Sequence, residues 1–171
     1  VVRLYLQQNL RNGITTAAVF CTVHRASADV FFEEAHALGL RMIAGKVMMD
    51  RGAPEGLLDT AERGYRESKA LLGRWHGQGR QLYAITPRFA PSCTGPLLRA
   101  VSDLAEKDGA VIHTHAAETP LELDMVKRET GGDEIAYLDS VGISGPRATL
   151  AHCVWATPES IQRLARQQTN I

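Results

Sequence analysis

The feature that most constrains the fold is a repeated alternation of short apolar runs with longer amphipathic stretches. The apolar runs have the length and composition of buried strands. They predict parallel strands near residues 15–23, 41–48, 82–86, 110–115 and 148–152. Apolar residues at helical spacing follow each run, and the longest such stretch predicts a helix that begins at Pro54 and reaches Trp75. Alternation of this kind gives parallel strands joined by right-handed helical crossovers, with the helices outside.

Two α/β architectures fit this pattern, a (β/α)8 TIM-type barrel and an open doubly wound sheet. A nucleotide-binding open sheet is disfavoured, because the sequence has no G-x-G-x-x-G after its first strand and no G-x-x-x-x-G-K-[ST] anywhere. A complete barrel needs about 200 residues or more, and the chain has 171. The sequence therefore predicts a partial (β/α)8 TIM-type barrel of about five consecutive βα units.

Composition and charge limit the binding partners and the cellular compartment that we expect for this protein. The 19 basic residues balance the 19 acidic ones, so neither nucleic acid nor an anionic membrane is indicated as a partner. No apolar run has the length of a membrane span, and the N-terminus lacks the pattern of a signal peptide. The three cysteines lie far apart and are interpreted as reduced thiols, which favours the cytoplasm.

Side chains capable of chemistry recur where the predicted strands end. They are His24, Asp50, Arg88, His115 and His152. The carboxyl ends of parallel strands face the ligand site in α/β proteins, so these residues are expected to gather at one mouth. Each also has a structural interpretation when taken alone: His24 can be a loop residue, and Asp50 can cap the loop and helix that follow it. The recurrence at one edge is what indicates a site.

The strand near residues 110–115 carries the most informative group. His113 and His115 are two residues apart and point to the same face of the sheet. Glu118 follows where Thr119 and Pro120 predict a helix start. His115 is a metal-ligand type and Glu118 a proton-transfer type. The alternative is a buried histidine hydrogen-bonded to a carboxylate, while His113 either supports His115 or packs in the core.

Five segments, in the right order and over nearly the whole chain, resemble the guanine deaminases of the amidohydrolase superfamily. They are GKVMMDR (45–51), LDTAE through YRES (58–68), ITPRFAPS (85–92), HTHAAE (113–118) and LAHC (150–153). T-P-R-F-A is the most specific, whereas H-x-x-E and A-H-C are shared more widely in the superfamily. The family run H-x-S-E-N is here His115 to Thr119, which keeps the histidine and glutamate but not the serine and asparagine.

The resemblance implies hydrolysis of guanine to xanthine and ammonia by zinc-activated water in the complete enzyme, with one divalent ion per subunit. It makes His115 a metal ligand that also contacts the substrate. Glu118 becomes the catalytic proton shuttle, which touches the substrate as well, and His152 a second catalytic residue near the attacking water. Arg88 and Phe89 become the base-binding pair, since a guanidinium suits the carbonyl oxygen of guanine and a phenyl ring packs against a purine.

The same resemblance implies that the other metal ligands, a first-strand H-x-H pair and a last-strand aspartate, lie outside this sequence. Residues 1–171 are then the central portion of a single amidohydrolase barrel domain. The chain starts without Met and ends where a new element would begin, which also suggests a piece of a longer protein. We expect the piece alone to be inactive, and the complete protein to be a homodimer that acts on a small purine.

Two other interpretations stay open. The first is a related amidohydrolase that acts on another aminated purine, a pterin or a triazine. The second is a non-catalytic α/β barrel fragment or dimerisation piece. Zinc stoichiometry in a longer form of the protein separates the second from the enzymes, and preference among aminated rings separates the enzymes from each other.

Overall fold

Every strand pairing in the computed structural model, which describes residues 1–171, is parallel. The strands are β1 (Thr16–Phe20), β2 (Arg41–Gly45), β3 (Val47–Met48), β4 (Leu82–Pro87), β5 (Val111–Ala116) and β6 (Ala148–His152). Their order in the sheet is β1-β2-β4-β5-β6, and β3 pairs with β4. Neighbours in the sheet therefore follow the order of the chain, as in a barrel that winds in one direction.

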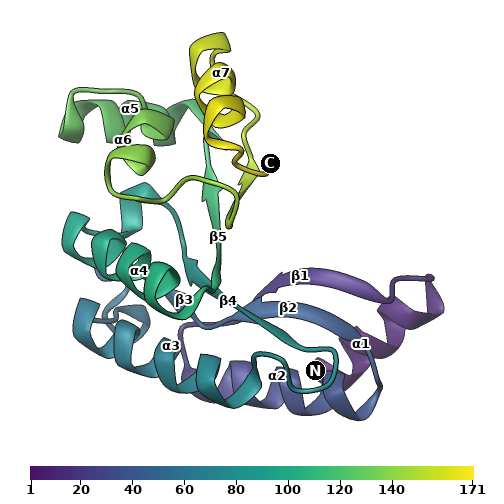
Figure 1. The fold of residues 1–171 in the computed structure, drawn as a ribbon. Helices are drawn as coiled ribbons and strands as arrows, with labels where there is room; N and C mark the ends of the chain where they lie inside the picture. Colours follow the sequence, from purple (N-terminus) through teal and green to yellow (C-terminus); the bar gives the residue numbers. More distant parts are fainter.

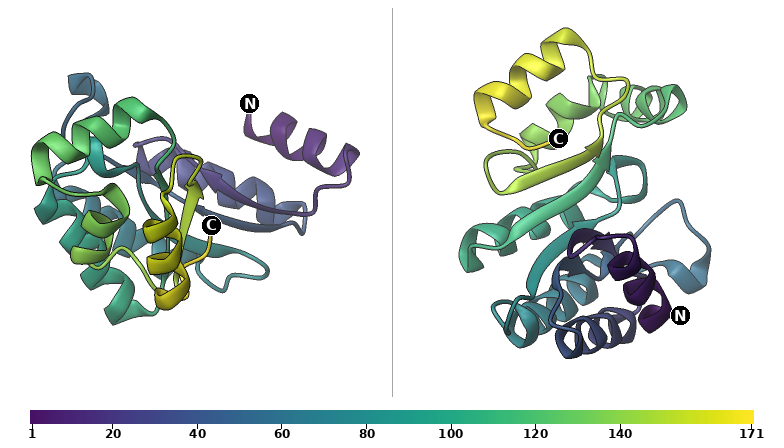
Figure 2. Two further views of the ribbon diagram at one scale, coloured as in Figure 1. Left: turned by 90° about the horizontal axis from the view of Figure 1, so that it is seen from above. Right: turned by 90° about the vertical axis from the view of Figure 1, so that its right-hand side faces the viewer.

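Helices connect these strands. They are α1 (Val2–Arg11), α2 (Arg25–Ala37), α3 (Ala61–Trp75), α4 (Gly95–Asp108), α5 (Pro120–Thr130), α6 (Glu134–Ser140) and α7 (Pro158–Gln167), with short 3-10 turns η1 (Glu55–Leu57) and η2 (Ala90–Ser92). The sheet is strongly curved, and α2, α3 and α4 cover its outer face while the inner face stays open (Figures 1 and 2). The prediction of a partial (β/α)8 barrel is confirmed.

Local sequence accounts for most helix ends. Threonine or aspartate side chains accept a backbone hydrogen bond at the start of α3, α4, α5, α6 and α7. Thr119 and Glu122 form a full capping box at α5. Gly109 and Gly131 end α4 and α5 with positive φ angles of 67° and 75°, which glycine adopts at little cost.

Three predicted boundaries were wrong. The first strand ends at Phe20 rather than residue 23. The predicted strand 41–48 is divided at Lys46, where a Cβ at the preceding Gly45 would collide with the Ala84 carbonyl, and β3 pairs only with β4. Pro54 precedes η1 and not a long helix, because the chain returns to an extended conformation at Leu58 before α3 begins.

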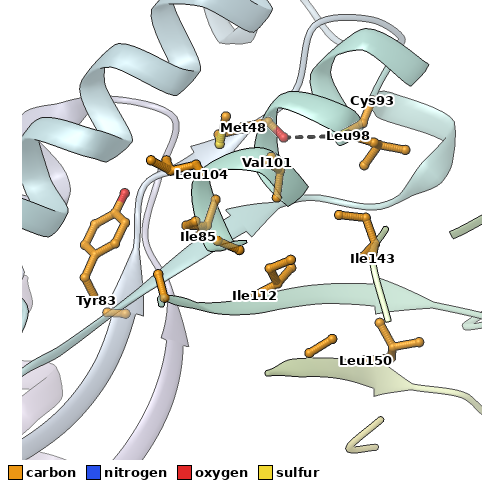
Figure 3. Packing of buried hydrophobic residues seen from close by; sticks show 14 of the residues in the cluster. Met48, Tyr83, Ile85, Cys93, Leu98, Val101, Leu104, Ile112, Ile143 and Leu150 are labelled. Atoms are coloured by element: carbon orange, nitrogen blue, oxygen red, sulfur yellow. Dashed lines mark hydrogen bonds between the residues drawn. The ribbon is translucent and has the colours of Figure 1, made fainter. Parts of the chain in front are cut away.

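The core lies between the outer face of the sheet and the helices. Ile85 of β4 and Ile112 of β5 are buried with Leu98, Val101 and Leu104 of α4 (Figure 3). Burial of such side chains from both layers supplies most of the favourable free energy of folding. This layer fixes the strands, and so fixes where their carboxyl ends lie.

The two lateral strands of the sheet differ. β1 pairs only with β2, whereas β6 pairs with β5 and also forms a parallel bridge from Thr149 to Asn170.

None of the helices combines the length and the apolar character that crossing a bilayer requires.

Candidate active site

The inner face of β5 carries the two histidines of the candidate site. Ile112 and Ala116 belong to the buried core cluster on the outer face, so the alternation along a strand directs His113 and His115 inward. The Phe20 ring, at the end of β1, lies 4.2 Å from the ring centroid of each histidine. His113 is buried, and burial together with the neighbouring His115 lowers its pKa to about 4. It is therefore neutral near pH 7 and lines the site without adding charge.

His115 is held in one orientation by the end of β4. Its backbone N–H donates to the Arg88 carbonyl oxygen at 3.0 Å, and its ring Nδ1 lies 2.7 Å from that same oxygen. A carbonyl oxygen only accepts, so Nδ1 must carry the proton. Nε2 then keeps its lone pair free, which is the arrangement that metal-binding histidines show.

Glu118 and His152 come together from two adjacent strand ends. The Nε2 atom of His152 lies 3.6 Å from the Oε2 atom of Glu118, and about two fifths of each side chain is exposed. The rings of His115 and His152 are stacked, with centroids 5.3 Å apart. The pairing of Ala116 with His152 in the sheet brings these residues side by side. A carboxylate and an imidazole in this arrangement can exchange a proton with a common ligand.

Backbone conformation at these two turns is unusual. Ala117, His152 and Cys153 have positive φ angles of 49°, 76° and 49°. Residues other than glycine rarely adopt this region, and they keep it where surrounding contacts impose it. Two hydrogen bonds of 2.9 Å join the turns, from Cys153 N–H to the Ala116 carbonyl and from Trp155 N–H to the Ala117 carbonyl.

Arg88 and Phe89 leave the end of β4 beside this group. The Arg88 guanidinium lies 4.8 Å from the centroid of the Phe89 ring, and its Nη1 atom is 3.9 Å from the Met49 sulfur. The Arg88 side chain is exposed and Phe89 is half-buried. The Arg88 backbone thus orients His115, while its side chain remains available to a ligand.

The turn that carries Arg88 is supported from the end of β3. The Asp50 carboxylate accepts hydrogen bonds from the Thr94 N–H at 2.8 Å and the Thr94 hydroxyl at 2.5 Å. Arg51 donates to the Ala90 carbonyl at 2.8 Å and forms an ion pair with Glu129. Asp50 therefore braces the turn before α4, and not the loop and helix that follow Asp50 along the chain, as its structural interpretation expected.

The structure brings His115, Glu118 and His152 into contact and places Arg88 next to them through its carbonyl. His24 does not join them: it precedes the first residue of α2 and is exposed, because β1 ends earlier than predicted. Its backbone contacts are with Thr22 and Ser27.

The whole sequence, residues 1–171, matches the Amidohydrolase family. The chain belongs to the amidohydrolase family. It is 46% identical over 171 residues to guanine deaminase of Escherichia coli strain K12, covering 98% of this chain and 39% of that protein. It is 36% identical over 135 residues to 5′-deoxyadenosine deaminase of Methanothermobacter thermautotrophicus, covering 78% of this chain and 31% of that protein.

Solved structures agree with the fold. Escherichia coli guanine deaminase superposes with a TM-score of 0.94 at 43% identity, covering 97% of this chain and 39% of that one. The atrazine chlorohydrolase of Arthrobacter aurescens complexed with zinc superposes with a TM-score of 0.91 at 25% identity, covering 98% and 40%. The chain thus spans about two fifths of the length of these relatives.

The donor set of this amidohydrolase chain fits part of a metal site. His115 has the free Nε2 atom that a ligand needs. No group of three or more histidine, cysteine, aspartate or glutamate side chains in the chain is arranged to hold a metal ion. Since zinc sites in enzymes use about three protein ligands, His115 can contribute to such a site but cannot form it alone.

Sequence reasoning missed three residues around the site. Phe20 packs on both histidines, and its only signal was its position near the end of an apolar run. Glu122 and Glu134 are buried carboxyl residues, 4% and 0% exposed, that accept hydrogen bonds from the turn carrying Glu118. The capping-box spacing of Thr119 and Glu122 could have indicated one of them, whereas no local pattern indicates Glu134.

Proposed function

We propose that this chain forms the central part of an enzyme that hydrolyses guanine to xanthine and ammonia. The observation that carries the proposal is the contact of Glu118 with His152 beside the oriented ring of His115. The identity of 46% to Escherichia coli guanine deaminase supports guanine as the substrate. Residues 1–171 are proposed to be the central portion of a single barrel domain.

Glu118 is the proton carrier in this proposal. Its carboxylate takes one proton from the attacking water and delivers it to a ring nitrogen of the base. It then carries the second proton of that water to the amino group, which leaves as ammonia. His152 holds the same water through Nε2, 3.6 Å from the Glu118 carboxylate. Because both side chains are partly exposed on the inner face, a ligand in the mouth reaches both of them.

His115 is the proposed metal ligand of this chain and also faces the base. His115 would hold a zinc ion together with ligands from elsewhere in the protein, and the bound ion would supply a water of lowered pKa. The zinc complex of the structurally similar atrazine chlorohydrolase supports this assignment. The Arg88 carbonyl fixes the imidazole so that Nε2 is free for this role.

Arg88 and Phe89 are proposed to bind the base. The guanidinium donates hydrogen bonds to the carbonyl oxygen of guanine, and the phenyl ring packs against the purine. The exposed guanidinium beside the half-buried ring supports this pairing.

A related activity on another aminated ring is the second candidate. The chain is also similar to a 5′-deoxyadenosine deaminase and an atrazine chlorohydrolase. Residues 117 and 119, alanine and threonine here, differ from the guanine deaminase run H-x-S-E-N. These positions flank Glu118, so they are where a change of substrate would arise.

Ammonia release by the full-length protein tests the proposal. Guanine, adenine, 5′-deoxyadenosine, a pterin and an aminated triazine should be compared by kcat/KM, with Glu118→Gln as the matched inactive control. Guanine should be the preferred substrate, and preference for another ring would favour the second candidate. A full-length protein without zinc and without turnover on any of these substrates would favour the non-catalytic interpretation.

The 171-residue chain on its own gives an independent check. Because it contains no cluster of three metal donors, we expect no stoichiometric zinc and no ammonia release from guanine. One zinc per chain with turnover would show that all ligands lie within these residues, which contradicts the assignment of His115 as a single contributor. The cytoplasmic location, supported by three free cysteines, and the dimeric state stay predictions.

A further inference from the structure

Two buried carboxyl groups lie behind the turn that carries Glu118. The Oε2 atom of Glu134, at the start of α6, accepts a hydrogen bond from the Ala117 N–H at 2.9 Å. The Oε2 atom of Glu122, in α5, accepts from the N–H groups of Glu118 at 3.0 Å and Thr119 at 3.3 Å. Three consecutive backbone amides of the turn are thus held by these two side chains.

The second oxygen of each carboxyl group has no other partner. Oε1 of Glu122 and Oε1 of Glu134 are buried and receive no hydrogen bond from any N–H or O–H group of the protein. Two adjacent carboxylates cannot both stay ionised away from water, so one of them keeps its proton. Burial, and then Glu122 beside it, raise the pKa of Glu134 to about 8. A neutral Glu134 can donate its proton to Glu122, which accounts for both unpartnered oxygens.

The other groups facing the pair are consistent with a shared proton. Asp133, adjacent to Glu134, adds further negative charge. Burial raises the pKa of the Cys153 thiol, which lies near both glutamates, to about 11 and keeps it neutral. Asp124 and Lys127 of α5 line the same cavity as Glu134 and carry opposite charges. Asp133 and the neutral thiol therefore still favour retention of one proton by the pair.

The turn in front of the pair is held away from its preferred conformation. Ala117 has a φ angle of 49°, and its carbonyl accepts a hydrogen bond from Trp155, which follows His152 along the chain. Such a conformation persists only where several contacts impose it. The bond from Ala117 N–H to Glu134 is one of those contacts, and it acts on the residue that directly precedes Glu118.

We propose that protonated Glu134, hydrogen-bonded to Glu122, is a positioning residue that fixes the Ala117–Thr119 turn and so sets the Glu118 carboxylate against His152. This inference rests on the proposed role of Glu118 as proton carrier. Glu134 itself touches neither substrate nor metal ligand, and it acts through the backbone.

Two substitutions of Glu134 separate positioning from bulk structure. In Glu134→Gln the amide oxygen still accepts from Ala117, and the amide nitrogen donates to Glu122 in place of the acid proton. Glu134→Ala removes both bonds and leaves Glu122 without its partner. Glu106→Ala, at an exposed glutamate of α4, is the matched control for loss of a carboxylate.

Kinetics of the full-length protein with its preferred substrate test the inference. We expect Glu134→Gln to keep kcat within about 3-fold of wild type, and Glu134→Ala to lower kcat by 10-fold or more with KM and zinc content unchanged. In the pH profile of wild type, kcat should fall at alkaline pH as the pair loses its proton. Glu134→Gln should lack this alkaline limb of the profile. Hydrogen exchange of the Ala117, Glu118 and Thr119 amides should speed up in Glu134→Ala and not in Glu134→Gln.

The outcomes are distinct. Wild-type kcat and amide exchange in Glu134→Ala would overturn the inference. Equal losses in both variants, with an unchanged alkaline limb, would overturn it too, because a purely structural glutamate is not rescued by the amide. If Glu134→Ala does not fold, Glu134→Gln and the two pH profiles still decide. Should Glu118→Gln retain full activity, the proposed function fails instead, whatever the Glu134 variants show.

Discussion

The turns that follow β4 and β5 lie side by side but are held in different ways. The turn after β4 carries Arg88 and is braced by the Asp50 carboxylate, which accepts two hydrogen bonds from a partly buried Thr94. The turn after β5 carries Glu118 and is held by two buried carboxyl groups, Glu122 and Glu134. One brace is a single carboxylate near solvent, and the other is a pair that can share a proton.

The difference matches the task of each turn. A side chain that binds a base through hydrogen bonds tolerates small movements, so an accessible brace beside Arg88 is sufficient. A group that moves protons must stay within hydrogen-bond reach of water and base, since misplacement by about 1 Å can cost about 100-fold in rate. The buried pair fixes three backbone amides of the turn that carries Glu118. The position of this turn therefore depends on whether the Glu122–Glu134 pair keeps its proton.

The largest effect is expected from Glu118→Gln in the full-length protein. The amide keeps the size of the side chain but cannot carry a proton, so kcat should fall by about 10²–10⁴-fold. Zinc content, measured by mass spectrometry, should not change because Glu118 is not a proposed ligand. A normal kcat in this variant would mean that the turn after β5 carries no proton-transfer group, so its task would no longer differ from that of the turn after β4.

Arg88→Ala should act mainly on binding. Loss of a hydrogen bond from a charged donor to the base should cost about 1.5–3 kcal/mol, seen as a higher KM for guanine with kcat and zinc content less affected. Arg88→Lys is the matched control, since it keeps the charge but not the planar donor pair. Unchanged kinetics in Arg88→Ala would mean that the base is held elsewhere.

Glu134→Gln should change how stability depends on pH. Glu134 has a folded-state pKa raised from about 4.5 to about 8, so its contribution to stability is fully present below pH 4.5 and is lost as the pH rises toward 8. Within this window wild type should lose up to about 1.4 kcal/mol per pH unit relative to Glu134→Gln. Denaturant unfolding of both proteins at pH 5, 6.5 and 8 measures this. A constant difference would argue against a retained proton.

The smallest effect is expected from Asp50→Asn. The amide can still accept from Thr94 N–H, but it loses the charge that strengthens both bonds. Because Asp50 is only partly buried, we expect about 1 kcal/mol less stability and a slight rise in KM, with the pH profile of kcat unchanged. An altered alkaline limb in this variant would show that the two turns are not independent.

The sequence by itself determined the parallel sheet, the outer helices and the strand ends where chemistry gathers. It did so because strand and helix periods, and caps such as Thr94 and Thr119, are local properties of the chain. Local pattern also placed His115 and Glu118 at one strand end. Local pattern failed at Pro54, where the chain returns to an extended conformation at Leu58. It failed also at the end of β1, where Thr22, His24 and Ser27 hydrogen-bond one another at the start of α2.

Only the tertiary structure decided how the site is held. The bond of His115 Nδ1 to Arg88 spans 27 residues, that of Ala117 to Glu134 spans 17, and that of Thr94 to Asp50 spans 44. No periodicity or helix cap in the sequence predicts these long-range hydrogen bonds, because they arise from the curvature of the sheet and from the packing of α4, α5 and α6 around it. The sequence thus determines which residue types at the strand ends can do chemistry. The tautomer of His115 and the partner of Glu122 depend instead on which strand ends the folded sheet brings together.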